Sequence, residues 1–210
     1  MQRFREPVNG FTHLAGAVLS ALGLIWLVAV TQNNTPKMMS LVIYGVSMIL
    51  LYSASATFHL IKTSDEKLLW LRRFDHAAIY VLIAGTYTPL FYNLLDGSLR
   101  WLLLVIVWLV ALAGAAYKLF FLRDSGLLSL ACYVIVGCIG VVSAPQTLRV
   151  LPSGAIILIG LGVIFYLIGV VVFGLEKPNF YRHFGHHEIW HLLVMGGSIV
   201  HFIAILLYIA

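Results

Sequence analysis

Two histidines near the C-terminal end of the sequence, His187 and His191, have the spacing of a pair of metal ligands. Residues four apart on an α-helix project from the same face, one turn above the other. Because neutral imidazole nitrogens are common ligands of zinc, a single ion can take one nitrogen from each ring. The pair stands where a long apolar stretch begins, so the candidate site lies at one end of a hydrophobic helix.

Glu188 follows His187 directly and completes the pattern H-E-x-x-H. In zinc metalloproteases this pattern supplies two ligands and a glutamate that acts as general base. A motif of three fixed positions also arises by chance, and a third ligand would have to come from elsewhere in the chain. An intramembrane metalloprotease is therefore a minor alternative.

The composition predicts an integral membrane protein. Hydrophobic residues make up 61% of the chain, charged residues only 10%, and the mean hydropathy is +0.99. Apolar stretches of about 20 residues are long enough to cross a bilayer as helices. We expect an all-α bundle of seven transmembrane helices that forms a single domain over residues 1–210. The expected helices lie near residues 11–31, 38–61, 74–95, 101–121, 126–144, 153–174 and 187–209.

The positive charges predict the orientation of this bundle. Ten of the 13 Lys and Arg residues fall before the first helix or in every second connection, and only Lys37, Arg100 and Arg149 fall on the other side. Positively charged loops stay in the cytoplasm, so the N-terminus is predicted to be cytoplasmic and the C-terminus outside. The distribution of the positive charges, rather than the net charge of +5, is therefore informative, and it indicates membrane topology. We expect no nucleic-acid partner.

The polar residues of the expected helices gather at the cytoplasmic end. Each ionisable group inside a membrane helix costs roughly 2.5 to 3.5 kcal/mol, so several that converge are expected to satisfy one another. A bound cation achieves this when imidazoles supply nitrogens and a carboxylate balances the charge. The residues concerned are Glu6, Asn9 and His13, then Ser55 and His59, then Asp75 and His76, and finally His186, His187 and His191.

Five motifs in this order resemble the hemolysin III family over essentially the whole chain. They are Glu6-x2-Asn9-x3-His13, Ser55-x3-His59, Phe74-Asp75-His76, the stretch Ala84 to Pro89 (A-G-T-Y-T-P), and His187-x3-His191. That family is the bacterial branch of the progestin and adiponectin receptor superfamily. The resemblance implies a seven-helix bundle with a buried zinc held by three histidines.

Carried onto this sequence, the resemblance assigns the zinc ligands to His59, His187 and His191. It assigns Asp75 to holding the water at the metal, with Ser55 one turn before His59 as a second catalytic candidate. The remaining motif, with Glu6, Asn9 and His13, is expected to be structural or to support the ligands through hydrogen bonds.

The function that this pattern favours is zinc-dependent hydrolysis of a lipid amide or ester, because three protein ligands leave one position of a zinc ion open for chemistry. The superfamily's similarity to alkaline ceramidases points to a lipid amide. The alternative is a cytolysin, pore or receptor-like protein in which zinc is only structural. In either case we expect a multi-pass protein of the plasma membrane, with lipid as its environment and candidate substrate.

Overall fold

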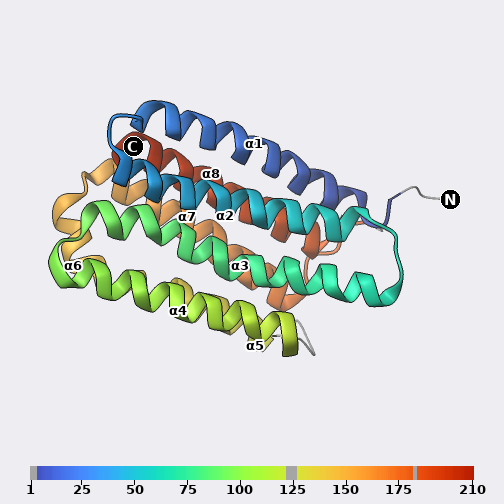
Figure 1. Ribbon diagram of the computed structural model, residues 1–210. Helices are drawn as coiled ribbons and strands as arrows, with labels where there is room; N and C mark the ends of the chain where they lie inside the picture. Colours follow the sequence, from blue (N-terminus) through green and yellow to red (C-terminus); the bar gives the residue numbers. More distant parts are fainter. Residues whose placement is uncertain (1–3, 122–126, 182–183) are drawn as a thin grey trace.

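A computed structural model describes residues 4–121, 127–181 and 184–210 of the chain (Figure 1). Over these residues the chain forms seven helical spans that are long and apolar enough to cross a membrane, which confirms the predicted seven-helix bundle. The helices are α1 (Pro7–Thr31), α2 (Thr35–Leu60), α3 (Asp65–Leu94), α4 (Gly97–Phe121), α5 (Leu127–Gly137), α6 (Gly140–Val150), α7 (Ser153–Leu175) and α8 (His186–Tyr208).

Helix α3 begins nine residues earlier than its apolar pattern predicted, at Asp65 rather than near residue 74. The extra turns carry charged residues, so a search for apolar windows misses them. Asp65 and Glu66 lie in the first turn, where negative charge stabilises the partly positive end of the helix dipole. No proline or glycine interrupts the segment that follows, so the helix continues into the membrane span.

The fifth span is broken into two helices, α5 and α6, where the sequence predicted one. The chain turns at Cys138 and Ile139, and the span then continues to Val150 rather than ending near residue 144. The Tyr87 hydroxyl, from α3, fills the break: it donates to the Gly137 carbonyl and accepts from the Gly140 N–H at 3.1 Å. Inside a bilayer such a break is stable only where other groups satisfy the freed backbone.

Successive helices pack side by side from α1 to α4, and α7 packs along α8. The last helix also returns to the first, because α8 contacts α1 (Figure 1). One cluster of buried apolar side chains lies between α3, α4 and α5, and a second joins α1, α2, α3 and α8. The outward faces carry large exposed apolar side chains, as expected for surfaces that face lipid.

The two termini lie at opposite ends of the bundle (Figure 1), as an odd number of spans requires. We call the end that carries the N-terminus the N-terminal end. The connection between α2 and α3 and the one between α7 and α8 also lie there, with Lys62 and Lys177 in them. Three further positive charges that the sequence assigned to this end, Arg3, Arg123 and Arg182, fall outside the described residues.

Gly85 lets α3 approach α2 closely, and replacing it is expected to destabilise the protein. A Cβ atom at this position would lie 2.1 Å from the Ser47 Oγ and 2.6 Å from the Ser47 Cβ, so backbone must move. Gly85→Ala should therefore lower the free energy of unfolding by about 1 to 3 kcal/mol, the usual cost of overpacking. Thermal unfolding in detergent measures this. Gly160→Ala is the matched control, since nothing that the structure describes, apart from the adjoining backbone of its own helix and its chain neighbours, lies within 4 Å of its Cβ position.

Candidate metal centre

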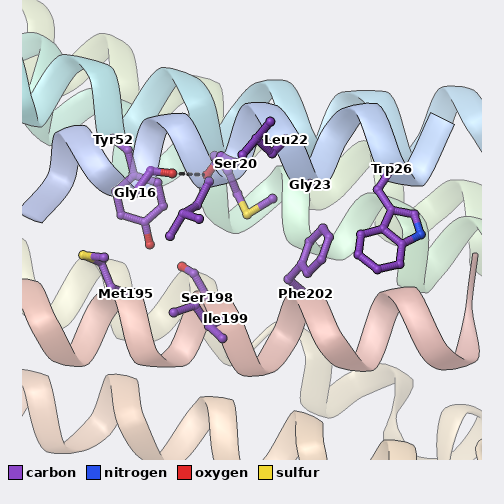
Figure 2. Close-up of a pocket in the computed structure, with 12 residues that line it drawn as sticks. Gly16, Ser20, Leu22, Gly23, Trp26, Tyr52, Met195, Ser198, Ile199 and Phe202 are labelled. Atoms are coloured by element: carbon purple, nitrogen blue, oxygen red, sulfur yellow. Dashed lines mark hydrogen bonds between the residues drawn. The ribbon is translucent and has the colours of Figure 1, made fainter. Parts of the chain in front are cut away.

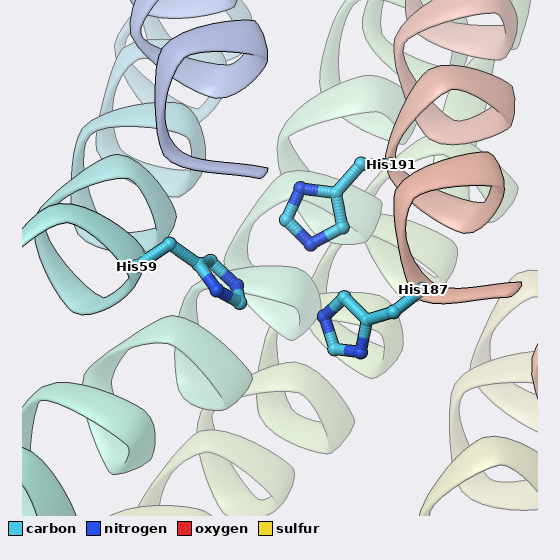
Figure 3. Close-up of side chains that lie close together, drawn as sticks. All are labelled: His59, His187 and His191. Atoms are coloured by element: carbon cyan, nitrogen blue, oxygen red, sulfur yellow. The ribbon is translucent and has the colours of Figure 1, made fainter. Parts of the chain in front are cut away.

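Three histidines from two helices converge at the N-terminal end of the bundle. His59 lies in the last turn of α2, and His187 and His191 lie on successive turns at the start of α8 (Figure 3). One ring nitrogen from each of them lies within 4.8 Å of the other two. Nitrogens that share a tetrahedral zinc are about 3.4 Å apart, given Zn–N bonds of about 2.0 to 2.1 Å. The rings therefore need to close by no more than about 1.4 Å, which side-chain rotation can supply.

The ring nitrogens of this cluster have the properties of ligands for a metal cation. His59 Nε2 and His191 Nδ1 are buried and have no hydrogen-bond partner among the described residues. A buried polar atom without a partner carries a free-energy penalty of about 1 to 3 kcal/mol. A metal ion that accepts both lone pairs removes that penalty, and the donor set of three imidazoles suits zinc.

Glu6 fixes the orientation of the His59 ring. The His59 Nδ1–H donates to the Glu6 Oε2 at 2.5 Å, which leaves the Nε2 lone pair directed away from Glu6. Histidine ligands of metals commonly donate their second N–H to a carboxylate in this way, which holds the tautomer and the ring plane. Burial raises the pKa of the Glu6 carboxyl, but the hydrogen bond from His59 and the positive charge of Arg5 outweigh burial and lower it below its usual range.

The N-terminal segment holds Glu6 in place by binding the C-terminal end of α2. The Glu6 N–H donates to the His59 carbonyl at 2.9 Å, and the Arg5 guanidinium donates to the Phe58 carbonyl at 2.7 Å. The same guanidinium lies 4.1 Å from the centre of the Phe58 ring and 3.3 Å from the Glu6 carboxylate. The last carbonyls of a helix have no partner within it, so these contacts also cap α2.

Asp75 and Ser55 form a pair beside the histidines. The Ser55 hydroxyl, buried on α2 one turn before His59, faces the Asp75 carboxylate of α3. The charged groups near this carboxylate include Arg5 and Glu6, and His59 lies near it as well. The structure thus brings the three predicted ligands and the two predicted catalytic residues to one end of the bundle.

His13 adds a fourth imidazole next to this cluster. Its ring stacks on the His191 ring, with centroids 3.8 Å apart, and meets the edge of the Tyr52 ring at 5.0 Å. Both of its nitrogens are buried without a hydrogen-bond partner among the residues described. The stack restrains the His191 ring from the side of α1.

Asn9 and Glu188 connect α1 to the beginning of α8. The Asn9 amide donates to the Glu188 Oε1 at 2.9 Å, while the Glu188 Oε2 accepts from the Gly185 N–H at 2.7 Å. A glutamate that reaches back to the residue before its helix satisfies one of the free N–H groups there. Glu188 therefore uses both carboxylate oxygens to start and position α8.

Three further histidines that the structure describes, His76, His186 and His201, have partners outside the cluster. The His76 ring Nδ1 is 3.4 Å from the Tyr133 hydroxyl, and the His186 Nδ1 is 2.8 Å from the Asn179 side-chain oxygen. His201 lies further along α8, where its Nε2 donates to the Ile159 carbonyl of α7 at 3.1 Å. The sequence did not reveal that Glu6 pairs with His59 or His13 with His191, because these contacts join segments that lie far apart along the chain.

Comparisons with known proteins show the family of this chain. Residues 1–202 match the family model described as "Haemolysin-III related". The chain is 38% identical to a protein of Bacillus subtilis (strain 168) named "Hemolysin-3 homolog" over 205 residues, which are 97% of this chain and 93% of that protein. It is 39% identical to "Hemolysin-3" of Bacillus cereus over 207 residues, 97% of this chain and 91% of the relative. The chain is therefore a multi-pass membrane protein that belongs to the hemolysin III family.

Proposed function

We propose that this protein is a zinc-dependent hydrolase that acts on a lipid amide or ester at the cytoplasmic side of the plasma membrane. The observation that carries the proposal is the convergence of His59, His187 and His191 within 4.8 Å, with the Ser55–Asp75 pair beside them. Three nitrogens leave one coordination position of a tetrahedral zinc open, which is typical of catalytic rather than structural sites.

Zinc, when bound, supplies a Lewis acid that polarises a carbonyl and makes water a nucleophile near neutral pH. Asp75 then acts as general base: its carboxylate takes a proton from the attacking water and returns it to the leaving nitrogen or oxygen. The Ser55 hydroxyl, which faces that carboxylate, keeps it in position. Glu6 and His13 hold the rings of His59 and His191, so the ligands need little reorganisation.

A lipid is the substrate class that suits the position of this site. The histidines lie within or at the end of membrane-spanning helices, and the faces around them carry exposed apolar side chains. A water-soluble substrate would lose its hydration on entering such surroundings, whereas a lipid brings its scissile bond to the membrane boundary.

Chelation tests this proposal directly. The purified protein should hydrolyse a ceramide or an ester lipid in mixed micelles. Activity should fall to background after dialysis against a zinc chelator and return when zinc is added. Hydrolysis that survives complete metal removal would contradict the proposal.

One observation favours a second candidate function, in which the metal is a structural link. The three nitrogens come from α2 and α8. The backbones of these two helices have few other close contacts with each other. A metal held there would tie the first half of the chain to its last helix. The name of the Bacillus cereus relative, "Hemolysin-3", refers to that protein and does not decide between the two functions.

The cytoplasmic location of the site depends on the orientation that the charges predict. A C-terminal fusion to alkaline phosphatase, which folds only outside the cytoplasm, should be active, and a C-terminal fusion to green fluorescent protein should be dark. The reverse pattern would place the histidines at the outer surface. An N-terminal fluorescent fusion, expected to be bright, is the control.

A further inference from the structure

A cavity of about 350 Å³ lies between α1, α2 and α8, beyond the histidine cluster (Figure 2). It begins at Gly16 and Tyr52 and extends along α1 and α8 to Trp26 and Phe202. Ten residues of helix separate Gly16 from Trp26, so the cavity runs for about 15 Å along the bundle. Its volume lies near the lower end of the range for small-molecule sites, about 300 to 1,000 Å³.

Two glycines of α1 give this cavity its shape. The Tyr52 ring lies 3.0 Å from where a Cβ of Gly16 would be, and the Phe202 ring lies 2.8 Å from the Cβ position of Gly23. Larger residues at these positions would push the two aromatic rings away from α1. The rings lie at different depths along α1, and the cavity follows the helix past both of them (Figure 2).

The cavity opens toward the lipid and is lined almost entirely by apolar side chains. Leu22 and Trp26 of α1 and Ile199 of α8 line it and are 58%, 58% and 48% exposed. In a membrane-spanning segment an exposed side chain faces hydrocarbon. Water needs two to four polar partners to occupy a buried site, and this lining offers few. Hydrocarbon from the bilayer is therefore the material that fills it.

One polar group in the lining, the Tyr52 hydroxyl, makes no hydrogen bond within the part of the chain that the structure describes. The Tyr52 hydroxyl is buried, faces the side chain of Ser198, and reaches hydrogen-bond geometry with none of the residues that the structure describes. The two serines of the lining are already paired: Ser20 donates to the Gly16 carbonyl at 2.7 Å, and Ser198 pairs with the Tyr166 hydroxyl at 3.0 Å. Buried hydroxyls are normally satisfied, so Tyr52 indicates a missing acceptor.

We propose that this cavity binds one acyl chain of a membrane lipid, whose carbonyl oxygen accepts a hydrogen bond from the Tyr52 hydroxyl. The chain runs outward along α1 and α8 toward Trp26. Tyr52 contacts His13, and His13 stacks on His191, so this site adjoins the histidine cluster but uses none of its three candidate ligands. The proposal therefore does not rest on hydrolysis.

Photolabelling tests the proposal. The protein is reconstituted in vesicles of phosphatidylglycerol and phosphatidylethanolamine that contain a phosphatidylglycerol with a diazirine in its palmitoyl chain, and labelled residues are mapped by mass spectrometry. We expect the label to concentrate on cavity residues such as Met48 and Met195. Ser20→Phe, which fills the cavity, should reduce this labelling about tenfold, and Tyr52→Phe about two- to tenfold, the value of one hydrogen bond.

Val18→Phe is the matched control, because Val18 lies on the same helix, is 55% exposed and does not line the cavity. Leu22→Trp fills the cavity from its exposed side and serves if Ser20→Phe does not fold. Equal labelling of the outward face of α4, at Leu102 or Val105, would mean surrounding lipid only and would overturn the proposal. So would cavity labelling that Ser20→Phe and Leu22→Trp leave unchanged.

The same labelling after metal removal separates this site from the proposed enzyme. Cavity labelling should persist in chelated protein, and its loss there would overturn the independence of the two sites. Failure of the protein to hydrolyse any lipid would leave the labelling result unaffected.

Discussion

Asp75→Asn is expected to reduce lipid hydrolysis by about a hundredfold to ten-thousandfold, the usual contribution of a general base. Asparagine has nearly the same shape and still accepts a hydrogen bond from Ser55, but it cannot take a proton from water. Because Asp75 is not one of the three clustered histidines, the variant should keep its metal. Turnover of a ceramide and metal content, measured on the same preparation, test both parts.

Asp96→Asn is the matched control for this variant. Asp96 lies at the other end of the bundle, where its carboxylate is 99% exposed and pairs with Arg100 at 3.2 Å. Its replacement should leave turnover unchanged. If Asp75→Asn also retained full turnover, or if the unmodified protein hydrolysed no lipid, the structural role of the metal would be the better account.

His191→Ala is expected to weaken zinc binding by more than about a hundredfold, so that the purified variant carries little metal. Loss of a group that only orients a ligand already costs about 10- to 100-fold, and removal of a ligand itself costs more. Glu6→Gln should weaken zinc binding by this smaller amount, because it weakens the hydrogen bond that orients the His59 ring. Titration with a competing chelator measures the affinity of each variant.

His201→Ala is the control for the loss of a buried imidazole. His201 lies on the same helix as His191 and is also buried, but it binds the Ile159 carbonyl and lies outside the cluster. This variant should hold as much zinc as the unmodified protein, with some loss of stability. Full zinc content in His191→Ala would mean that the metal binds elsewhere.

The seven spans were predictable because the bilayer imposes a simple rule on the sequence. A helix must be apolar for about 20 residues to cross, and the described part of the chain has seven such stretches. The helix ends were less predictable where polar residues continue a helix beyond the membrane, as at Asp65, or where a tertiary contact permits a break. The break after Gly137 depends on Tyr87, which lies 50 residues away, so no local sequence pattern predicted it.

The candidate ligands were predictable for a related reason. His187 and His191 show their common face through their spacing alone, and an ionisable residue in an apolar helix, such as His59, stands out against its surroundings. The supporting residues lacked such a signal. Glu6 precedes the first helix, and nothing in its neighbourhood along the chain indicates that its carboxylate meets His59.

By itself the sequence determined that this is a membrane protein, how many spans it has and which residues are able to bind a metal. These properties follow from composition and from spacing along single helices. Only the tertiary structure decided how helices pair and which side chains meet across them. It placed Glu6 on His59, His13 on His191 and Glu188 at the beginning of α8, and it opened a cavity beside Tyr52. Contacts of this kind depend on the distances between helices, which a pattern along one chain does not record.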